Sequence, residues 1–248
     1  MSTTLPSWVQ NFFDGFYAQC DLRWPAEHQK YVAQGLLNHL RLSPGARVFD
    51  QCCGEGYLAH ALAAEGCRVW GIDQSSRYIH TAQHLTPSGT FVAGDAGTYA
   101  PDVELDGAVN WHTSLGYGGQ MGALALLRQL TTSLKKQGLF VVDVRNVELY
   151  KQSPLVSIEH IDTAKWGTVQ MTRVGRWEGN TLWQNWNATV DGEEVWSQND
   201  AACFHPSLPE MDDLFDNIGA RRVTVLGTLD APFDRGNHER MIVVGQKI

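Results

Sequence analysis

Three carboxylates and a glycine-rich turn are the residues of this sequence most suited to binding chemistry. Asp50 comes just before a turn that holds Gly54 and Gly56, and Asp73 and Asp95 follow further along the chain. Glycines let a backbone approach a ligand where a Cβ would collide, and a helix N-terminus offers unpaired N–H groups. A carboxylate at Asp50 suits a cationic group and would repel a pyrophosphate. Asp73 can accept hydrogen bonds from both ribose hydroxyls, and Asp95 can accept one from the exocyclic amine of adenine.

Each of these acids stands at or just after the end of an expected β-strand. From residue 44 to about 145, short apolar runs alternate with helical patterns, which is typical of a parallel sheet wound with helices. Acids around one glycine turn fit a ligand that contains an amino acid, a ribose and an adenine, and S-adenosylmethionine is such a ligand. The expected strands are Arg47–Asp50, Arg68–Asp73, Thr90–Ala93, Gly107–Asn110 and Leu139–Val144. The expected helices are Tyr57–Glu65, Ser76–Leu85 behind Ser75 as N-cap, and Met121–Leu134.

Residues 44 to about 150 resemble the class I, Rossmann-like, S-adenosylmethionine-dependent methyltransferases. The shared motifs are Asp50…Gly54-Glu55-Gly56, Gly71-Ile72-Asp73, Gly94-Asp95-Ala96 and Asn110. The resemblance is closest to a small-molecule branch, through the segment from Asn110 to Tyr117 and through Asp143-Val144-Arg145-Asn146. It implies S-adenosylmethionine as cofactor and S-adenosylhomocysteine as product. The implied cofactor-binding residues are Asp50, Cys52, Gly54, Gly56, Asp73, Gln74, Asp95, Ala96 and Asn110.

The resemblance also distributes roles among these residues. Cys52 departs from the family, which has its first motif glycine there, and we expect the backbone approach to be altered at that point. Two structural alternatives stay open, because Asp50 could cap the following turn and Asn110 could be an ordinary turn residue at a strand end. The implied contacts are the methionine end for Asp50 and Gly54, the ribose for Asp73, the adenine for Asp95 and Ala96, and the methionine side for Asn110.

Methyl transfer from a sulfonium is an in-line displacement, so the protein mainly aligns the nucleophile, the methyl group and the sulfur. Such alignment supplies roughly 7–11 kcal/mol of barrier reduction. A base is needed only when the acceptor is protonated before attack. His112 follows the fourth strand and is the candidate base, although packed histidines are common. Tyr117 and Arg145 complete the candidate catalytic set by orienting the substrate, and Arg145 and Asn146 have a loop brace as the alternative role.

Aromatic residues gather ahead of the first strand. Trp8, Phe12 and Phe16 fall four apart, with Phe13 and Tyr17 beside them, so one short helix would carry a broad aromatic face. This face could be plain core or the wall of a pocket. A second helix is expected from near Pro25 to about Leu42.

After residue 155 the apolar period changes to two. An antiparallel meander is expected over Thr168–Trp177, Thr181–Val190 and Glu194–Phe204, with turns at Gly179-Asn180 and Asp191-Gly192. Its tryptophans 177, 183, 186 and 196 are interpreted as sheet packing. We hypothesise that the aromatic helix and the meander form a hydrophobic lid that favours a small planar or heterocyclic acceptor, methylated on nitrogen or oxygen. The candidate substrate-binding residues are Phe12, Phe16, Tyr17, Trp111, His112 and Asn146.

A helix over Leu208–Ile218 and strands at Val223–Leu229 and Arg240–Gln246 would return to the first sheet. The predicted fold is therefore α/β, with a Rossmann-like, doubly wound, mostly parallel seven-stranded sheet, an inserted antiparallel meander and an N-terminal helical lid. A single domain over 1–248 is expected. Its predicted parts are the lid over 1–43, the cofactor-binding core over 44–154, the insertion over 155–205 and the closing helix and strands over 206–248.

Composition narrows the classes of partner. Nineteen basic against 27 acidic residues give a formal charge of −8 without any basic run, so binding to nucleic acid or to an anionic membrane is not expected. No apolar run approaches the roughly 20 residues of a spanning helix, and the first residues do not resemble a signal peptide, so a cytoplasmic location is expected. A monomer or a homodimer is the expected oligomeric state. Five cysteines without paired metal spacing predict reduced thiols and no metal site.

Three other functions stay open at this point. Gly54, Gly56 and Ala59 satisfy a loose dinucleotide fingerprint, so a nicotinamide-dependent oxidoreductase is the first alternative. The second is a protein that binds S-adenosylmethionine without turnover. The third keeps the cofactor and changes the reaction, as in an intramolecular cyclisation of S-adenosylmethionine.

Overall fold

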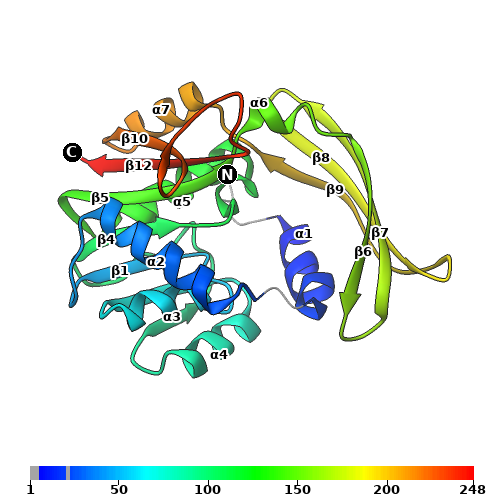
Figure 1. The fold of residues 1–248 in the computed structure, drawn as a ribbon, viewed down its shortest axis with the longest axis horizontal. Helices are drawn as coiled ribbons and strands as arrows, with labels where there is room; N and C mark the ends of the chain where they lie inside the picture. Colours follow the sequence, from blue (N-terminus) through cyan, green and yellow to red (C-terminus); the bar gives the residue numbers. More distant parts are fainter. Residues whose placement is uncertain (1–5, 21–22) are drawn as a thin grey trace.

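The computed structural model describes residues 6–20 and 23–248, which form two β-sheets with helices around the larger one (Figure 1). The larger sheet has eight strands in the order β11-β10-β12-β5-β4-β1-β2-β3. Its strands are β1 (Arg47–Gln51), β2 (Arg68–Asp73), β3 (Thr90–Ala93), β4 (Leu105–Asn110), β5 (Leu134–Arg145), β10 (Ala220–Thr228), β11 (Ala231–Pro232) and β12 (Arg240–Lys247).

The central sheet is mostly parallel, as predicted. Strands β1 to β5 pair in parallel, and β12 runs antiparallel to both β5 and β10. The strand order reverses between β1 and β4, where Gln51 lies opposite Asn110. Ligands of open α/β sheets bind at such a switch point, outside the carboxyl ends of the strands. The sheet has eight strands where the sequence predicted seven, because the two-residue β11 is too short to show a period-two pattern.

Helices cover both faces of this sheet, and side-chain caps mark the start of α4, α6 and α7. The side chain of Ser75 accepts a hydrogen bond from the Tyr78 N–H and begins α4 as expected. Pro25 stands one residue before α2 rather than inside it, and Arg41 ends that helix in the left-handed conformation with φ 56°. The helices beyond residue 20 are α2 (Ala26–Leu40), α3 (Tyr57–Ala64), α4 (Ser76–Leu85), the 3-10 turn η3 (Ser114–Gly116), α5 (Gly119–Thr132), α6 (Val147–Tyr150) and α7 (Leu208–Asp216).

The core lies on both sides of the larger sheet. Along β5, Val141 packs with α2 on one face, whereas Phe140 and Val142 pack with α5 and α7 on the other. Burial on both faces explains the continuous apolar run from Leu139 to Val142. The rigid two-sided packing fixes the strand ends on which the site is built.

The second sheet is antiparallel, with the strands in sequence order β6-β7-β8-β9. The predicted turns are present, since Gly179, Asp191 and Gly192 all have positive φ. Strand β6 was missed in the sequence, so the predicted three-stranded meander is a four-stranded sheet. The strands are β6 (Val156–Thr163), β7 (Gly167–Glu178), β8 (Thr181–Val190) and β9 (Glu193–Phe204).

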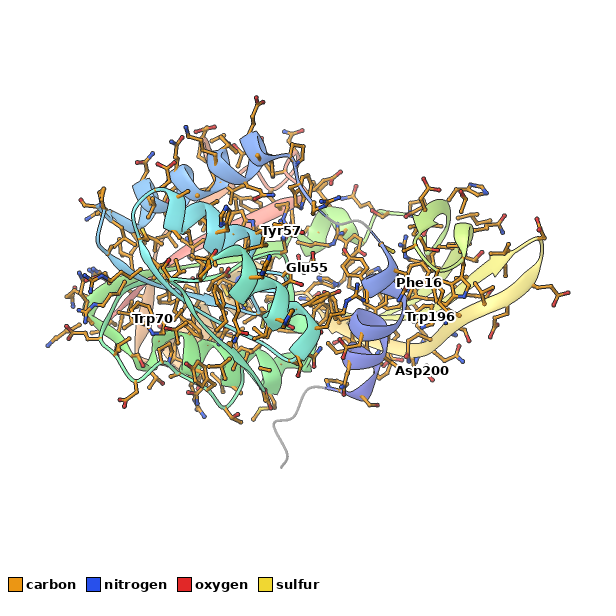
Figure 2. All side chains as sticks on the ribbon, turned by 90° about the horizontal axis from the view of Figure 1, so that it is seen from below. Phe16, Glu55, Tyr57, Trp70, Trp196 and Asp200 are labelled. Carbon is orange, nitrogen blue, oxygen red and sulfur yellow. The ribbon has the colours of Figure 1, made fainter. Side chains whose placement is uncertain are left out.

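The helical segment at residues 7–19 lies between the larger sheet and the second sheet (Figure 1). It comprises α1 (Ser7–Gln10), the π-helical η1 (Asn11–Phe16) and the 3-10 turn η2 (Tyr17–Gln19). Phe16 is buried against the second sheet, with its ring centroid 5.0 Å from that of Trp196, and Figure 2 labels this pair. An isolated bridge between Cys20, the residue after the segment, and Thr163 also connects it to β6. We keep the name N-terminal helical segment for residues 7–19.

All five cysteines lie in the described ranges and are free thiols. Within residues 6–20 and 23–248, no helix combines the length and the apolar character that crossing a bilayer requires. The same ranges contain no cluster of three or more His, Cys, Asp or Glu side chains arranged to hold a metal ion.

Candidate functional site

A cavity of about 880 Å³ opens at the carboxyl ends of β1, β2, β4 and β5. The N-terminal helical segment and the second sheet form its other walls, and Figure 2 shows Glu55 and Tyr57 on the side of the core that faces them. One end of the cavity is lined by the glycine turn and acids, and the other by aromatic rings. The two ends are therefore suited to different chemistry.

The glycine turn is open to the cavity at Gly54. This residue has φ +55°, and a Cβ added there would meet no atom within 4 Å. Cys52 also has a positive φ of 61°, which is unusual for a residue with a side chain. Its conformation explains why glycine suits this position in the resembling family. Gly56 plays a different part, because a Cβ there would lie 2.6 Å from the Cβ of Ala82 on α4, so Gly56 allows α3 and α4 to pack closely.

Within the described residues, three buried acceptors near the switch point lack donors. They are Oδ2 of Asp50, Oδ2 of Asp95 and Oδ1 of Asn110. Buried polar atoms are nearly always paired, so three orphaned acceptors in one region fit a ligand that brings N–H or O–H donors. Burial and the charge of Asp73 raise the pKa of Asp50 to about 7. A cationic group beside Asp50 would stabilise its ionised form.

Asp73 ends β2 in the cavity wall, as the sequence predicted. Its Oδ2 accepts a hydrogen bond from the Gly54 N–H and its Oδ1 accepts one from the Ser75 N–H, both at 3.0 Å. Burial raises the pKa of Asp73, and these two bonds oppose the rise. A carboxylate has about four acceptor sites, so Asp73 keeps capacity for ligand hydroxyls.

The turn after β4 holds His112 at the rim of the cavity. His112 and Thr113 both have positive φ, 62° and 67°. Asp143, which is 1% exposed, fixes this turn by accepting the His112 N–H at Oδ2 over 3.0 Å and the Thr113 N–H at its carbonyl oxygen over 3.0 Å. Partial burial lowers the pKa of His112, so its imidazole is neutral at pH 7 and able to accept a proton.

Arg240 completes this clamp. Its Nε donates to Oδ1 of Asp143 at 2.6 Å, its Nη2 also pairs with Oδ2 of Asp143, and the same Nη2 donates to Oγ1 of Thr113 at 2.8 Å. A paired and hydrogen-bonded carboxylate is the form in which a buried charge is tolerated. The Asp143–Arg240 pair therefore holds the strained His112 turn in place.

Aromatic rings of the N-terminal helical segment form one wall of the cavity. The Phe12 ring centroid lies 4.8 Å from that of Tyr17 and 4.5 Å from that of Trp186 on β8. Trp8 meets Tyr117 edge to face at 5.4 Å. These rings give a wall that excludes water and could stack on a planar molecule.

A second aromatic group surrounds Arg145 at the end of β5. The guanidinium carbon lies 4.6 Å from the centroid of the Tyr150 ring. Tyr150 meets His205 at 5.1 Å and Trp177 at 5.7 Å between ring centroids. All four side chains line the cavity.

The structure brings most of the sequence-predicted residues to this cavity. Asn146 instead caps α6, and its Nδ2 donates to the carbonyl oxygens of Arg235 and His238, which makes it a loop brace. Phe16 belongs to the core under the second sheet. Gly56, Asp95 and Asn110 also lie outside the cavity lining. The predicted residues that line the cavity are Phe12, Tyr17, Asp50, Cys52, Gly54, Asp73, Gln74, Ala96, Trp111, His112, Tyr117 and Arg145.

The second sheet supplies a part of the cavity that the sequence did not predict. Trp177 and Trp186 were interpreted as sheet packing, and both line the cavity. The signal was the alternation of side chains along a strand, which places every second residue on one face. The lining residues follow this period as 173, 175 and 177 on β7, 182, 184 and 186 on β8, and 201, 203 and 205 on β9 and just after it.

Residues 48–138 match the family model described as a methyltransferase domain. An uncharacterized methyltransferase of Synechocystis sp. is 40% identical over 58 residues, which are 23% of this chain and 27% of that protein. The match thus spans about a quarter of the length of that curated relative.

Solved structures resemble nearly the whole chain. The CcbJ methyltransferase from Streptomyces caelestis has a TM-score of 0.74 at 15% identity, over 92% of this chain and 100% of the other. An S-adenosylmethionine-dependent methyltransferase from Clostridium acetobutylicum scores 0.70 at 12% identity, over 97% of each chain. CalS10, an amino pentose methyltransferase from Micromonospora echinaspora, scores 0.66 at 16% identity, over 100% of each chain. The predicted Rossmann-like α/β methyltransferase fold is confirmed, and residues 48–138 are similar to a methyltransferase domain.

Proposed function

We propose that this chain, with its methyltransferase domain at residues 48–138, is an S-adenosylmethionine-dependent methyltransferase that acts on a nitrogen or oxygen of a small, planar or heterocyclic molecule. One observation carries the proposal. A single cavity joins a glycine turn and the Asp50 carboxyl group, which has a buried oxygen without a donor among the described residues, to a wall of aromatic side chains. The first end suits the cofactor and the second suits the acceptor.

At the cofactor end, the free oxygen of Asp50 binds the ammonium of the methionine part, and the open backbone at Gly54 lets that part come close. Asp73 accepts from the ribose hydroxyls. Asp95 and Ala96 bind the adenine, and Cys52, Gln74 and Asn110 complete the surroundings. When bound, S-adenosylmethionine supplies a methyl group on a positively charged sulfur. The orphaned acceptor at Asp50 argues against a nicotinamide dinucleotide, because a pyrophosphate near that carboxylate would be repelled.

The acceptor end supports a small substrate. Rings from the N-terminal helical segment and from the second sheet both line it and contact each other, as Phe12 and Trp186 do, so they form a continuous wall on which a flat molecule can stack. A macromolecule would need an open groove. CalS10, described as an amino pentose methyltransferase, also supports a small acceptor.

His112 is the proposed base for an acceptor that arrives protonated, since its neutral imidazole lies in the cavity wall on a turn fixed by Asp143. Tyr117 and Arg145 orient the acceptor. Trp111, Phe12 and Tyr17 bound the space and exclude water.

The proposal is tested by calorimetry with S-adenosylhomocysteine. The wild type is expected to bind it, and Asp73→Ala is expected to weaken the affinity roughly tenfold to a hundredfold, because a charged hydrogen-bond acceptor contributes about 1.5–3 kcal/mol. Asp102→Ala is the matched control, since Asp102 is exposed and outside the cavity lining. A melting curve of each variant confirms folding. Stabilisation by NAD but not by S-adenosylhomocysteine, or an unchanged affinity in Asp73→Ala, would contradict the proposal.

A further inference from the structure

We propose that the methyl acceptor carries an anionic oxygen group, a carboxylate or a phosphate, and that Arg145 binds this group. The inference rests on the proposed function in one respect, which is that the aromatic end of the cavity receives the acceptor. It adds a chemical class and an orientation to that acceptor.

The placement of Arg145 leaves its donors free for a ligand. It is the last residue of β5, half-buried in the cavity wall, and its guanidinium lies over the ring of Tyr150 at 4.6 Å. A guanidinium that stacks on a ring uses its flat face and keeps the N–H groups along its edge. That edge forms a fork which matches a carboxylate or a phosphate with two parallel hydrogen bonds.

Arg145 differs from the other arginines of the cavity. In the part of the chain that the structure describes, Arg173 pairs with Glu159 at 2.5 Å and Arg240 pairs with Asp143, whereas no carboxylate lies within 4.0 Å of Arg145. A half-buried guanidinium without a counter-ion is costly, and an anion on the ligand would offset that cost.

Glu159 is a carboxylate that also lines the cavity, and it is paired with Arg173, whereas three other ionisable groups around Arg145 are neutral at neutral pH. Burial raises the pKa of Tyr117 well above its usual range and that of Cys203 to about 12. Burial, together with the charges of Arg145 and Arg240, lowers the pKa of His205 to about 3, so this ring is neutral. Among the described residues, the positive charge of Arg145 therefore has no carboxylate partner of its own.

The cavity is consequently polarised along its length. Asp50 and Asp73 stand at the cofactor end, and Arg145 stands among the rings of Tyr150, Trp177 and His205 at the other. An acceptor held by its anionic group at Arg145 would point its opposite side toward the cofactor end. Arg145 then acts as a specificity residue that sets the direction in which the acceptor enters.

The test uses benzoate and its neutral isostere benzamide as probes, titrated by calorimetry into protein saturated with S-adenosylhomocysteine. Wild type is expected to bind benzoate at least about tenfold more tightly than benzamide, as for a charge-assisted pair. In Arg145→Gln this ratio is expected to fall to about one. Arg176→Gln should keep the wild-type ratio, because Arg176 lies on β7, which contributes other residues to the cavity, but is itself outside the cavity lining. Phenyl phosphate distinguishes the two candidate anionic groups. If it binds more tightly than benzoate, the acceptor's group is assigned as a phosphate, and if it binds more weakly, the group is assigned as a carboxylate.

Wild type that shows no preference for benzoate, including no binding of either probe, would overturn the inference, and so would a preference that survives in Arg145→Gln. If Arg145→Gln does not fold, Arg145→Lys replaces it. This variant keeps the charge without the fork, and its benzoate affinity should fall several-fold while its benzamide affinity stays unchanged. Failure of the wild type to bind S-adenosylhomocysteine would count against the proposed function alone, because benzoate titration of the unloaded protein still reports on Arg145.

Discussion

The carboxyl group of Asp50 is buried, and its Oδ2 accepts no hydrogen bond from the described residues. Its side chain is 2% exposed, and burial raises its pKa from the usual 3.8 to about 7. In the unliganded protein at pH 7, about half of the molecules therefore hold a proton at Asp50. A cationic amine at this carboxylate favours the ionised form, so binding has to expel that proton.

We predict that S-adenosylhomocysteine releases about half a proton at pH 7 on binding, and that this release is lost in Asp50→Asn. The number of protons follows from binding enthalpies measured in two buffers with different ionisation enthalpies. Asn keeps the shape of the side chain without its titration. An equal release from wild type and Asp50→Asn would show that the cofactor amine does not meet this carboxyl.

For individual residues, the sequence predicted the functional side chains at the ends of strands, but it did not predict the residues, far away in the chain, with which side chains of the cavity pair. Asp50 and Asp73 are recognisable because each ends a strand beside the glycine turn. The role of Arg240 could not be predicted, because its partner Asp143 lies 97 residues away and no local sequence pattern indicates the pairing. His205 was missed for the same reason, since only folding brings it to Tyr150 and Trp177.

At the scale of elements, the N-terminal helical segment is tied to the cofactor side of the core as well as to the second sheet. The Ser75 hydroxyl donates to Oδ1 of Asp14 at 2.5 Å, and the Tyr78 hydroxyl donates to the carbonyl oxygen of Phe13 at 3.1 Å. Phe12 reaches across to Trp186. These contacts place the segment where it can cover a bound cofactor, which supports the lid hypothesis.

We predict that Phe12→Ala speeds dissociation of S-adenosylhomocysteine several-fold, because removal of the ring opens a path between the segment and Trp186. Stopped-flow fluorescence of the cavity tryptophans measures the rate. Met121→Ala is the control, since Met121 is 69% exposed on α5 and outside the cavity lining. Equal dissociation rates in wild type and Phe12→Ala would rule out a covering role for this ring.

The elements could be predicted wherever burial follows a local pattern. Strands β2 and β3 and helix α4 have the predicted bounds. Strand β6 was missed because it lies at the edge of its sheet, with Val156 54% and Ile158 60% exposed, so its apolar residues do not mark a buried face.

At the scale of the whole molecule, His205 couples stability to pH. It is 3% exposed, and its pKa is about 3 in the folded protein against the usual 6.5. Between these values the unfolded chain binds a proton at this residue and the folded chain does not, so acid favours unfolding. The contribution is about 1.4 kcal/mol per pH unit within that window.

The free energy of unfolding falls as the pH drops from 6.5 toward 3, and we predict that it falls less steeply in His205→Phe. The slope against pH should decrease by the equivalent of about one bound proton. Chemical denaturation at several pH values measures this slope. Asp50 acts in the opposite direction, because its raised pKa costs stability as the pH rises from about 4 to 7, so the comparison is made against wild type. His80→Phe, at an exposed position on α4, should leave the slope unchanged. A slope identical in His205→Phe and wild type would contradict the assignment.

The clamp between Arg240 and Asp143 has a consequence for biosynthesis. A ribosome makes β4, β5 and the turn with His112 long before it adds Arg240, which comes later in the chain than every other residue of the cavity wall. Until then Asp143 has no Arg240 guanidinium to pair with, and the turn that holds His112 lacks the hydrogen bond from Arg240 to Thr113. Binding competence is therefore gained in a late step, when the strand that starts at Arg240 inserts between β5 and β10.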